Sequence, residues 1–122
     1  MRFLILLLIA GLSSLSCEEQ KTTDVYLQPV SVADFEKFVE ETGYETDAER
    51  YGWSIRQTDV YNFVKVDSAN WRIPDGVTPI SDKGLPVQQV SYNDAIAYCN
   101  WIGARLPSYE EFWALTKNDI RT

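Results

Sequence analysis

The chain has 122 residues, of which 11 are basic and 18 acidic, and its formal net charge at pH 7 is −7. An acidic balance without any basic cluster argues against binding to nucleic acid and to anionic lipid surfaces. The chain also has no histidine, which excludes Ser-His and Cys-His nucleophile pairs, histidine zinc sites and the two-His-one-carboxylate iron triad.

The first sixteen residues predict an export signal. Arg2 gives a positive start, and the apolar run from Phe3 to Leu12 is far shorter than the ~20 residues that a helix needs to cross a bilayer. Cys17 follows small residues directly, and the segment 14–17 (SLSC) resembles a relaxed bacterial lipobox. We predict a signal peptide over 1–16 and lipidation of Cys17. The alternatives are an ordinary cleaved signal with an incidental cysteine, and an uncleaved anchor.

These predictions place the mature chain outside the cytoplasm, lipid-anchored to the bacterial outer membrane and either periplasmic or at the cell surface. Residues 17–23 are then a polar linker, and residues 24–122 form one small domain that we expect to be incomplete. Removing residues 1–16 takes away only one charged residue, Arg2, so the mature net charge is −8. The membrane is therefore an expected partner through the lipid and not through the protein surface.

The predicted domain is α+β, with short helices, short strands and long loops. Three helices are indicated by a serine followed three residues later by an acid, which is the form of a capping box. The boxes pair Ser31 with Asp34, Ser91 with Asp94 and Ser108 with Glu111. Gly43 and Gly103 are natural ends for the first two helices. The first helix carries an apolar stripe at helical spacing, made of Val32, Phe35, Phe38 and Val39.

Extended segments are predicted between these helices. We expect a short strand or extended segment over 24–29, an acidic turn-rich connection over 44–52, and a short strand over 87–90. A longer strand should have as its core Tyr61, Phe63, Val64 and Val66. Trp71 stands in a loop with a turn at residues 74–76, and a large aromatic side chain there predicts a packed anchor. The third helix should present an apolar face made of Phe112, Trp113 and Leu115.

Four motifs in this order resemble the formylglycine-generating enzymes, also called sulfatase-modifying factors. The motifs are residues 32–54 (VADFEKFVEETGYETDAERYGWS), 71–76 (WRIPDG), 86–107 (PVQQVSYNDAIAYCNWIGARLP) and 110–113 (EEFW). The resemblance implies an elaborated C-type-lectin-like fold. Founding members of that family oxidise a cysteine of a sulfatase to formylglycine with copper and dioxygen, and relatives include iron-dependent sulfoxide synthases.

The resemblance also implies where the chemistry lies. The catalytic cysteine pair belongs to the C-terminal half of the family domain, which these motifs do not include. Cys99 matches a structural cysteine of the family, and we expect it to be a small buried side chain; the alternative is a reactive thiol. We predict no catalytic, cofactor-binding or metal-binding residue in this chain, and copper or calcium enters only through the family resemblance. Whether the chain is an enzyme stays open.

Three functional hypotheses follow. We favour an exported lipoprotein that resembles sulfatase-modifying factors and lacks catalytic competence as written. The first alternative is part of an active formylglycine-generating oxidase that acts on exported sulfatases. The second is a lectin-like surface module that binds a protein or glycan ligand.

Three groups of side chains could instead form sites. Five acids could bind calcium, although a solvated surface is the simpler interpretation: Glu40, Glu41, Glu45, Asp47 and Glu49. Arg72 and Arg105 could grip a ligand carboxylate, but such arginines more often pair with nearby acids or loop carbonyls. The four tryptophans, Trp53, Trp71, Trp101 and Trp113, could form a sugar- or peptide-binding platform, with core packing as the default.

Overall fold

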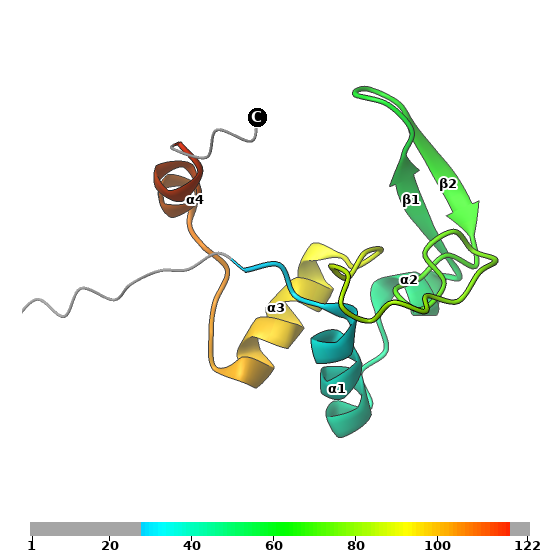
Figure 1. The fold of residues 1–122 in the computed structure, drawn as a ribbon, viewed down its shortest axis with the longest axis horizontal. Coiled ribbons are helices and arrows are strands. Elements are labelled where there is room, and N and C mark those ends of the chain that lie inside the picture. The colour runs from blue at the N-terminus through cyan, green and yellow to red at the C-terminus, as the bar shows by residue number, and fades with distance from the viewer. Residues whose placement is uncertain (1–27, 118–122) are drawn as a thin grey trace, which may run out of the picture.

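The computed structural model describes residues 28–117, so the predicted signal peptide, Cys17 and the linker lie outside the described residues. It has mixed helical and antiparallel structure, as expected, with six elements in the order α1 (Val32–Thr42), α2 (Asp47–Tyr51), β1 (Trp53–Gln57), β2 (Phe63–Asp67), α3 (Tyr92–Ile102) and α4 (Tyr109–Thr116). Helices α1 and α3 lie side by side, with the β1–β2 hairpin and α4 projecting to opposite sides (Figure 1). Within residues 28–117, no helix is long and apolar enough to span a membrane.

The predicted capping residues begin and end these helices. Full capping boxes stand at Ser91 and Ser108. At Ser31 the box is partial, because the hydroxyl accepts from the Asp34 amide and donates to the Asp34 carboxylate at 2.6 Å. Gly43 and Gly103 end α1 and α3 in the left-handed conformation, which glycine adopts at little cost.

Helix α2 interrupts the segment that the sequence pattern predicted to be a connection. Thr46 caps it, and a full capping box forms because the Glu49 side chain accepts from the Thr46 amide at 3.0 Å. The helix has five residues and no apolar stripe, so periodicity could not reveal it. It turns the chain directly from the end of α1 into strand β1.

The core is a small aromatic cluster between α1, α3 and the loop that contains Trp71. The Phe35 ring lies at the centre, with ring centroids 5.4 Å from Phe38, 5.4 Å from Trp71 and 5.9 Å from Tyr98. Trp71 is 1% exposed, which confirms it as the packed anchor of its loop. Burying such large rings contributes both apolar area and edge-to-face contacts.

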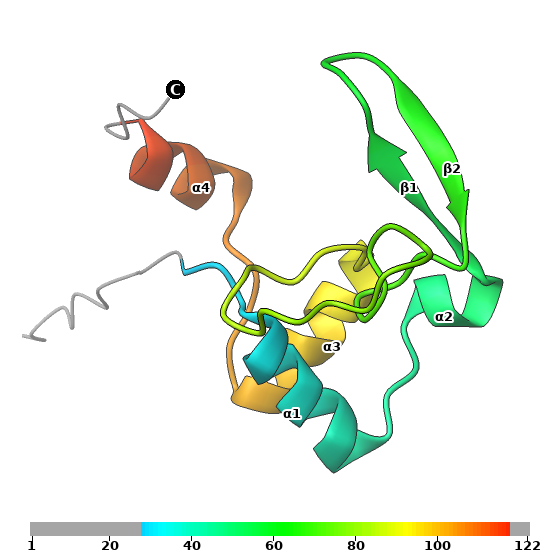
Figure 2. The same ribbon diagram turned by 45° about the vertical axis from the view of Figure 1, so that its right-hand side comes forward.

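The predicted strand near residue 63 forms, but it is not part of the core. β2 pairs antiparallel with β1 in a two-stranded hairpin, and the hairpin extends away from the helices (Figure 2). Phe63 is 63% exposed and Tyr61, in the connecting loop, is 88% exposed. Tyr61, which was predicted to belong to the core of this strand, therefore lies outside it, because β2 begins at Phe63.

One further expectation was wrong. Residues 87–90 do not form a strand: only Pro86 makes an isolated bridge, with Ser31, and Gln89 has a φ of 59°, which breaks an extended conformation. The apolar residues predicted for α4 are exposed in the described structure, with Trp113 53% exposed and no residue of α4 buried.

Candidate functional site

A buried carboxylate organises the centre of the described structure. Asp94 is fully buried and accepts three hydrogen bonds, from the Tyr44 hydroxyl at 3.0 Å, the Asp47 amide at 3.1 Å and the Ser91 amide at 2.7 Å. These donors come from the segment after α1, the start of α2 and the N-cap of α3. A buried charge requires such partners, so Asp94 fixes three segments relative to one another.

Asp47 adds a second connection between α2 and α3. Its carboxylate accepts from the Ser91 hydroxyl at 2.6 Å and from the Asn93 side-chain amide at 3.1 Å. These two hydrogen bonds lower the pKa of Asp47 below its ordinary value, so the carboxylate is ionised at neutral pH. Asp47 therefore holds a negative charge where α2 meets α3.

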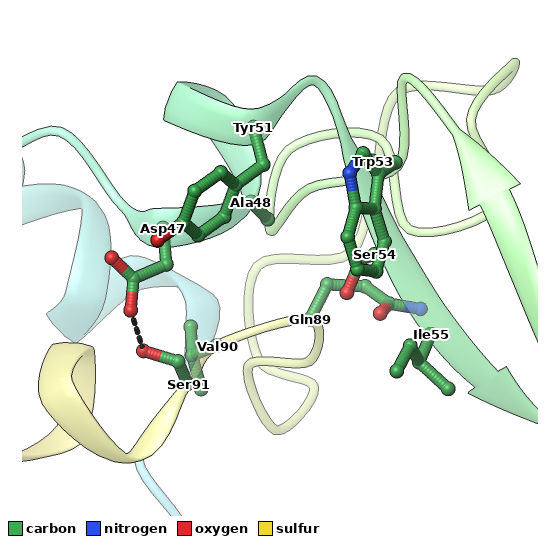
Figure 3. A pocket seen from close by; sticks show the side chains of 9 residues that line it. All are labelled: Asp47, Ala48, Tyr51, Trp53, Ser54, Ile55, Gln89, Val90 and Ser91. Carbon is green, nitrogen blue, oxygen red and sulfur yellow. Dashed lines mark hydrogen bonds between the residues drawn. The ribbon is translucent and has the colours of Figure 1, made fainter.

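A pocket of about 390 Å³ opens beside this junction. Figure 3 shows α2 and β1 on one side of it and the segment before α3 on the other. Nine residues line it: Asp47, Ala48, Tyr51, Trp53, Ser54, Ile55, Gln89, Val90 and Ser91. The Gln89 side chain donates to the Pro74 carbonyl at 3.0 Å, which ties this wall to the Trp71 loop.

Two aromatic side chains give the pocket an apolar side. The rings of Tyr51 and Trp53 are 6.3 Å apart and tilted by 34°, and Tyr51 is 63% exposed. The Lys65 ammonium lies 5.5 Å from the centroid of the Trp53 ring. The pocket thus combines an aromatic surface with a carboxylate and hydroxyl groups, which is the composition of a binding site.

The open edge of strand β1 also borders the pocket. Ser68 donates to the Gly52 carbonyl and Thr58 donates to the Asn62 carbonyl, so even-numbered residues of β1 face β2. Because hydrogen-bonding direction alternates along a strand, the backbone groups of Trp53, Ile55 and Gln57 point away from β2. No third strand pairs with them in residues 28–117.

The acidic group predicted as a possible calcium site does not form one. Glu49 pairs with Arg72, while Asp47 holds Ser91 and Asn93. Glu40, Glu41 and Glu45 are exposed, as a solvated surface predicts. Among the residues that the structure describes, no three acidic, cysteine or histidine side chains are grouped to hold a metal ion.

Both arginines that could bind a ligand carboxylate are paired with acids of the chain. Arg72 also stacks on the Trp71 ring, 4.1 Å from its centroid. Arg105 donates two hydrogen bonds of 2.7 Å to Glu111. That pairing, together with the Ser108 amide, lowers the pKa of Glu111 to about 2. These contacts confirm the interpretation that the arginines pair with nearby acids.

Cys99 is half-buried, so the expectation of a buried side chain was wrong. It lines a second pocket, of about 220 Å³, with Tyr92, Ile96, Asn100, Arg105 and Leu106. Of the four tryptophans, Trp71 is buried and Trp101 packs against the core cluster, whereas Trp53 borders the larger pocket and Trp113 is exposed. The default of core packing therefore holds for two of the four.

The structure adds pocket residues that the sequence did not single out, namely Tyr51, Ser54, Ile55 and Gln89. The sequence around these residues does not predict a pocket. Residues 89–91 lie beside residues 47–55 only because of the hydrogen bonds of Asp94 and Asp47. The motif at residues 32–54 was the available indication that this segment matters.

Comparison with known proteins identifies the class of protein. The family of sulfatase-modifying factor enzyme 1-like domains matches residues 23–116. The chain belongs to this family, as the four motifs predicted.

The chain is similar to individual members of this family from a mammal and from a bacterium. The formylglycine-generating enzyme of Mus musculus is 42% identical over 101 residues, covering 68% of this chain and 27% of the relative. The enzyme of that name from Thermomonospora curvata is 42% identical over 100 residues, covering 68% of this chain and 33% of the relative. The inactive C-alpha-formylglycine-generating enzyme 2 of Mus musculus is 42% identical over 101 residues, covering 69% of this chain and 33% of the relative. The chain thus spans about a third or less of these relatives.

Proposed function

We propose that this chain is an exported, lipid-anchored member of the sulfatase-modifying factor family that acts by binding and not by catalysis from its own residues. Residues 1–16 are the signal peptide, Cys17 carries the lipid, and residues 17–23 link it to the domain of residues 24–122. The apolar run before Cys17 supports the anchor. The location is the bacterial outer membrane, on its periplasmic or surface side.

Two observations support a binding role without catalysis. The chain is 42% identical both to a relative named as an enzyme and to one named as inactive, so the matched region is common to both. The chain has two cysteines and no histidine, and redox-metal sites need several soft or imidazole ligands. We infer that the matched region supplies a scaffold, of C-type-lectin-like fold, and a ligand site.

The open edge of β1 carries the proposal for the ligand. An extended peptide that lies along this edge can hydrogen-bond the backbone groups of Trp53 and Ile55, in the manner of an added strand. Its side chains then reach the aromatic surface of Tyr51 on one side and the Ser91 wall on the other. The proposed partner is therefore an extended segment of another exported protein.

A single proline substitution tests this mode of binding. Ile55→Pro removes an amide that faces the open edge and leaves the β1–β2 ladder intact, whereas Arg56→Pro removes a ladder amide. The probe is a fluorescein-labelled peptide of about twelve residues that spans the cysteine of an exported sulfatase. Anisotropy should show binding to the wild type, with affinity reduced at least 10-fold by Ile55→Pro, which is about 1.4 kcal/mol.

The other outcomes of this titration distinguish the alternatives. Equal affinity for Ile55→Pro would reject strand addition. Binding of a disaccharide panel with no binding of the peptide would favour the lectin-like alternative, for which the Tyr51 and Trp53 rings are the supporting observation.

The oxidase alternative has its own test. The oxidase alternative gains support if a cysteine of this chain itself binds copper, against the structural role that the family resemblance gives to Cys99. We expect titration of the purified chain with Cu(I) to reveal no tight site. Sub-micromolar affinity that is lost in Cys99→Ser would overturn the non-catalytic proposal.

The lipid anchor is tested independently of the ligand site. Metabolic labelling with an alkyne fatty acid should label the wild-type chain and leave Cys17→Ser unlabelled. Cys99→Ser serves as the matched control and should label as the wild type does. Labelling of Cys17→Ser would reject the anchor.

A further inference from the structure

Gln89, in the wall of the larger pocket, adopts a backbone conformation that its residue type disfavours. Its φ is 59°, in the left-handed region, where a residue with a Cβ is strained. Among the described residues, Ser68 is the other non-glycine residue with a positive φ. Such strain persists only where surrounding contacts maintain it, and it is frequent at binding sites. The contacts around Gln89 therefore indicate what this conformation positions.

Hydrogen bonds attach this wall to its surroundings at both ends. The Gln89 side-chain amide donates to the Pro74 carbonyl at 3.0 Å, in a partly buried contact. The loop of Pro74 in turn meets the hairpin, because Gly76 lies so close to β2 that a Cβ on it would be 2.4 Å from the Asp67 carbonyl oxygen. At the other end, the Ser91 hydroxyl donates to the first residue of α2 at 2.6 Å. The wall is thus held by elements that adjoin β1.

Two backbone amides of this wall have no acceptor in the part of the chain that the structure describes. The amides of Gln89 and Val90 donate to no backbone carbonyl or side chain there, although both residues are half-buried. The neighbouring amides are paired, since Val87 donates to a backbone carbonyl at 2.8 Å and Ser91 donates to the Asp94 carboxylate at 2.7 Å. An amide that is partly shielded from water is stabilised by an acceptor, which a ligand in the pocket can supply.

The open edge of β1 faces the same pocket from the other side. Trp53 and Ile55 line the pocket together with Gln89 and Val90, which come from the opposite wall (Figure 3). Unpaired main-chain groups on two walls suit a ligand with hydrogen-bonding groups along both of its edges. An extended peptide is such a ligand, because successive residues direct their N–H and C=O groups to alternate edges.

We propose that Gln89 positions a second main-chain contact for the peptide, so that the peptide is held along both edges. This inference rests on the proposed function, because it requires a peptide at the open edge of β1. One edge of the peptide pairs with β1, and carbonyls on its other edge accept from the amides of Gln89 and Val90. Gln89 is a positioning residue, because its side chain acts through the hydrogen bond to Pro74.

Amide hydrogen exchange, followed by NMR on the full chain, tests this contact. The probe is the twelve-residue peptide that spans the cysteine of an exported sulfatase. At saturation it should slow exchange of the Gln89 and Val90 amides at least 10-fold, together with those of Trp53 and Ile55. Slower exchange at Trp53 and Ile55 alone would overturn this inference and leave strand addition to β1 standing. Unchanged exchange at all four amides, with the peptide bound, would reject both.

A matched pair of variants tests the role of the Gln89 side chain. Gln89→Glu keeps the shape of the side chain but cannot donate to the Pro74 carbonyl, and anisotropy should show peptide affinity at least 10-fold weaker. Gln88→Glu adds the same charge at an exposed neighbour that does not line the pocket, and it should bind as the wild type does. Unchanged affinity in Gln89→Glu, or equal losses in both variants, would overturn the positioning role.

A glycine variant separates positioning from stability. Gln89→Gly relieves the strain of the left-handed conformation and also lacks the donor to Pro74. Its midpoint of urea denaturation should therefore be higher than that of Gln89→Glu, while its peptide affinity should be reduced to the same extent. Affinity that follows the denaturation midpoint, with Gln89→Gly binding as the wild type does, would show a purely structural role and overturn the proposal.

Discussion

The hydroxyl of Tyr44 donates to the buried carboxylate of Asp94 at 3.0 Å, across 50 positions of sequence. This contact joins the segment after α1 to the first turn of α3. Because Asp94 also accepts from the start of α2, it sets the position of the pocket wall formed by α2 and β1. The site thus depends on a polar contact outside the pocket itself.

Removal of the Tyr44 hydroxyl should measure this contact. Tyr44→Phe leaves the ring in place, 5.1 Å from Phe38, and deprives Asp94 of one donor. Loss of a hydrogen bond to a buried charged group costs about 1–3 kcal/mol. We expect urea denaturation to show a decrease of that size in the free energy of unfolding. Tyr92→Phe is the control, because Tyr92 is 72% exposed, and it should change stability by less than about 0.5 kcal/mol.

Titration of the tyrosines gives a second measure of the same contact. Burial and the hydrogen bond to Asp94 raise the pKa of Tyr44 from 10.0 to about 12. The stabilisation from the neutral hydroxyl is complete below pH 10 and is lost as the pH rises through 12. Tyr44 should therefore ionise at a higher pH than a tyrosine of ordinary pKa. In Tyr44→Phe, the phenolate absorbance should lose the part of its increase that occurs near pH 12 in the wild type. An unchanged titration curve would contradict the assignment.

The N-terminal cap of α4 should respond to acid. The Arg105 guanidinium and the Ser108 amide lower the pKa of Glu111 from 4.5 to about 2. A carboxylate whose pKa is lowered by folding stabilises the fold fully at any pH above its pKa in the unfolded state. That contribution disappears as the pH falls toward 2. Carbon-13 NMR of the Glu111 carboxyl should give a midpoint near 2. In Arg105→Gln the midpoint should rise, and a midpoint already near 4.5 in the wild type would reject the ion pair.

Gly76 holds the Trp71 loop against the end of β2. Its φ is 78°, and a Cβ there would lie 2.4 Å from the Asp67 carbonyl oxygen. Gly43, with a φ of 68°, has open space around it, so Gly43→Ala should cost only the ~1 kcal/mol of the left-handed conformation. We expect Gly76→Ala to lower the free energy of unfolding by at least twice as much, measured by urea denaturation. Equal losses of unfolding free energy in Gly76→Ala and Gly43→Ala would contradict the close approach of Gly76 to the Asp67 carbonyl.

Local signals in the sequence predicted three of the four described helices, and α2 was missed. Ser91 and Ser108 begin their helices through contacts within four residues, and Gly103 ends α3 in the same local way. Such interactions depend on neighbours in the chain, so a pattern reveals them. The family motifs likewise identified the class of protein from short ordered segments.

The packing of distant segments could not be predicted from the sequence pattern. Phe63 carries a strand-like pattern, but its exposure depends on which layers are present. Gln89 adopts a positive φ, a conformation that a glutamine does not signal, and it replaced the expected strand. The pocket forms because Asp94 and Asp47 bring residues 47–55 to residues 89–91, and those contacts are set by the fold as a whole.

The central claim is that the open edge of β1 receives an extended peptide. Amide hydrogen exchange, followed residue by residue by NMR, tests it most directly. In the free chain, the amides of Ser54 and Arg56 should be protected by β2, while those of Trp53, Ile55 and Gln57 exchange rapidly. Saturating peptide should protect the amides of Trp53 and Ile55 at least 10-fold. Unchanged exchange at both residues, in a sample where the peptide is bound, would contradict the account.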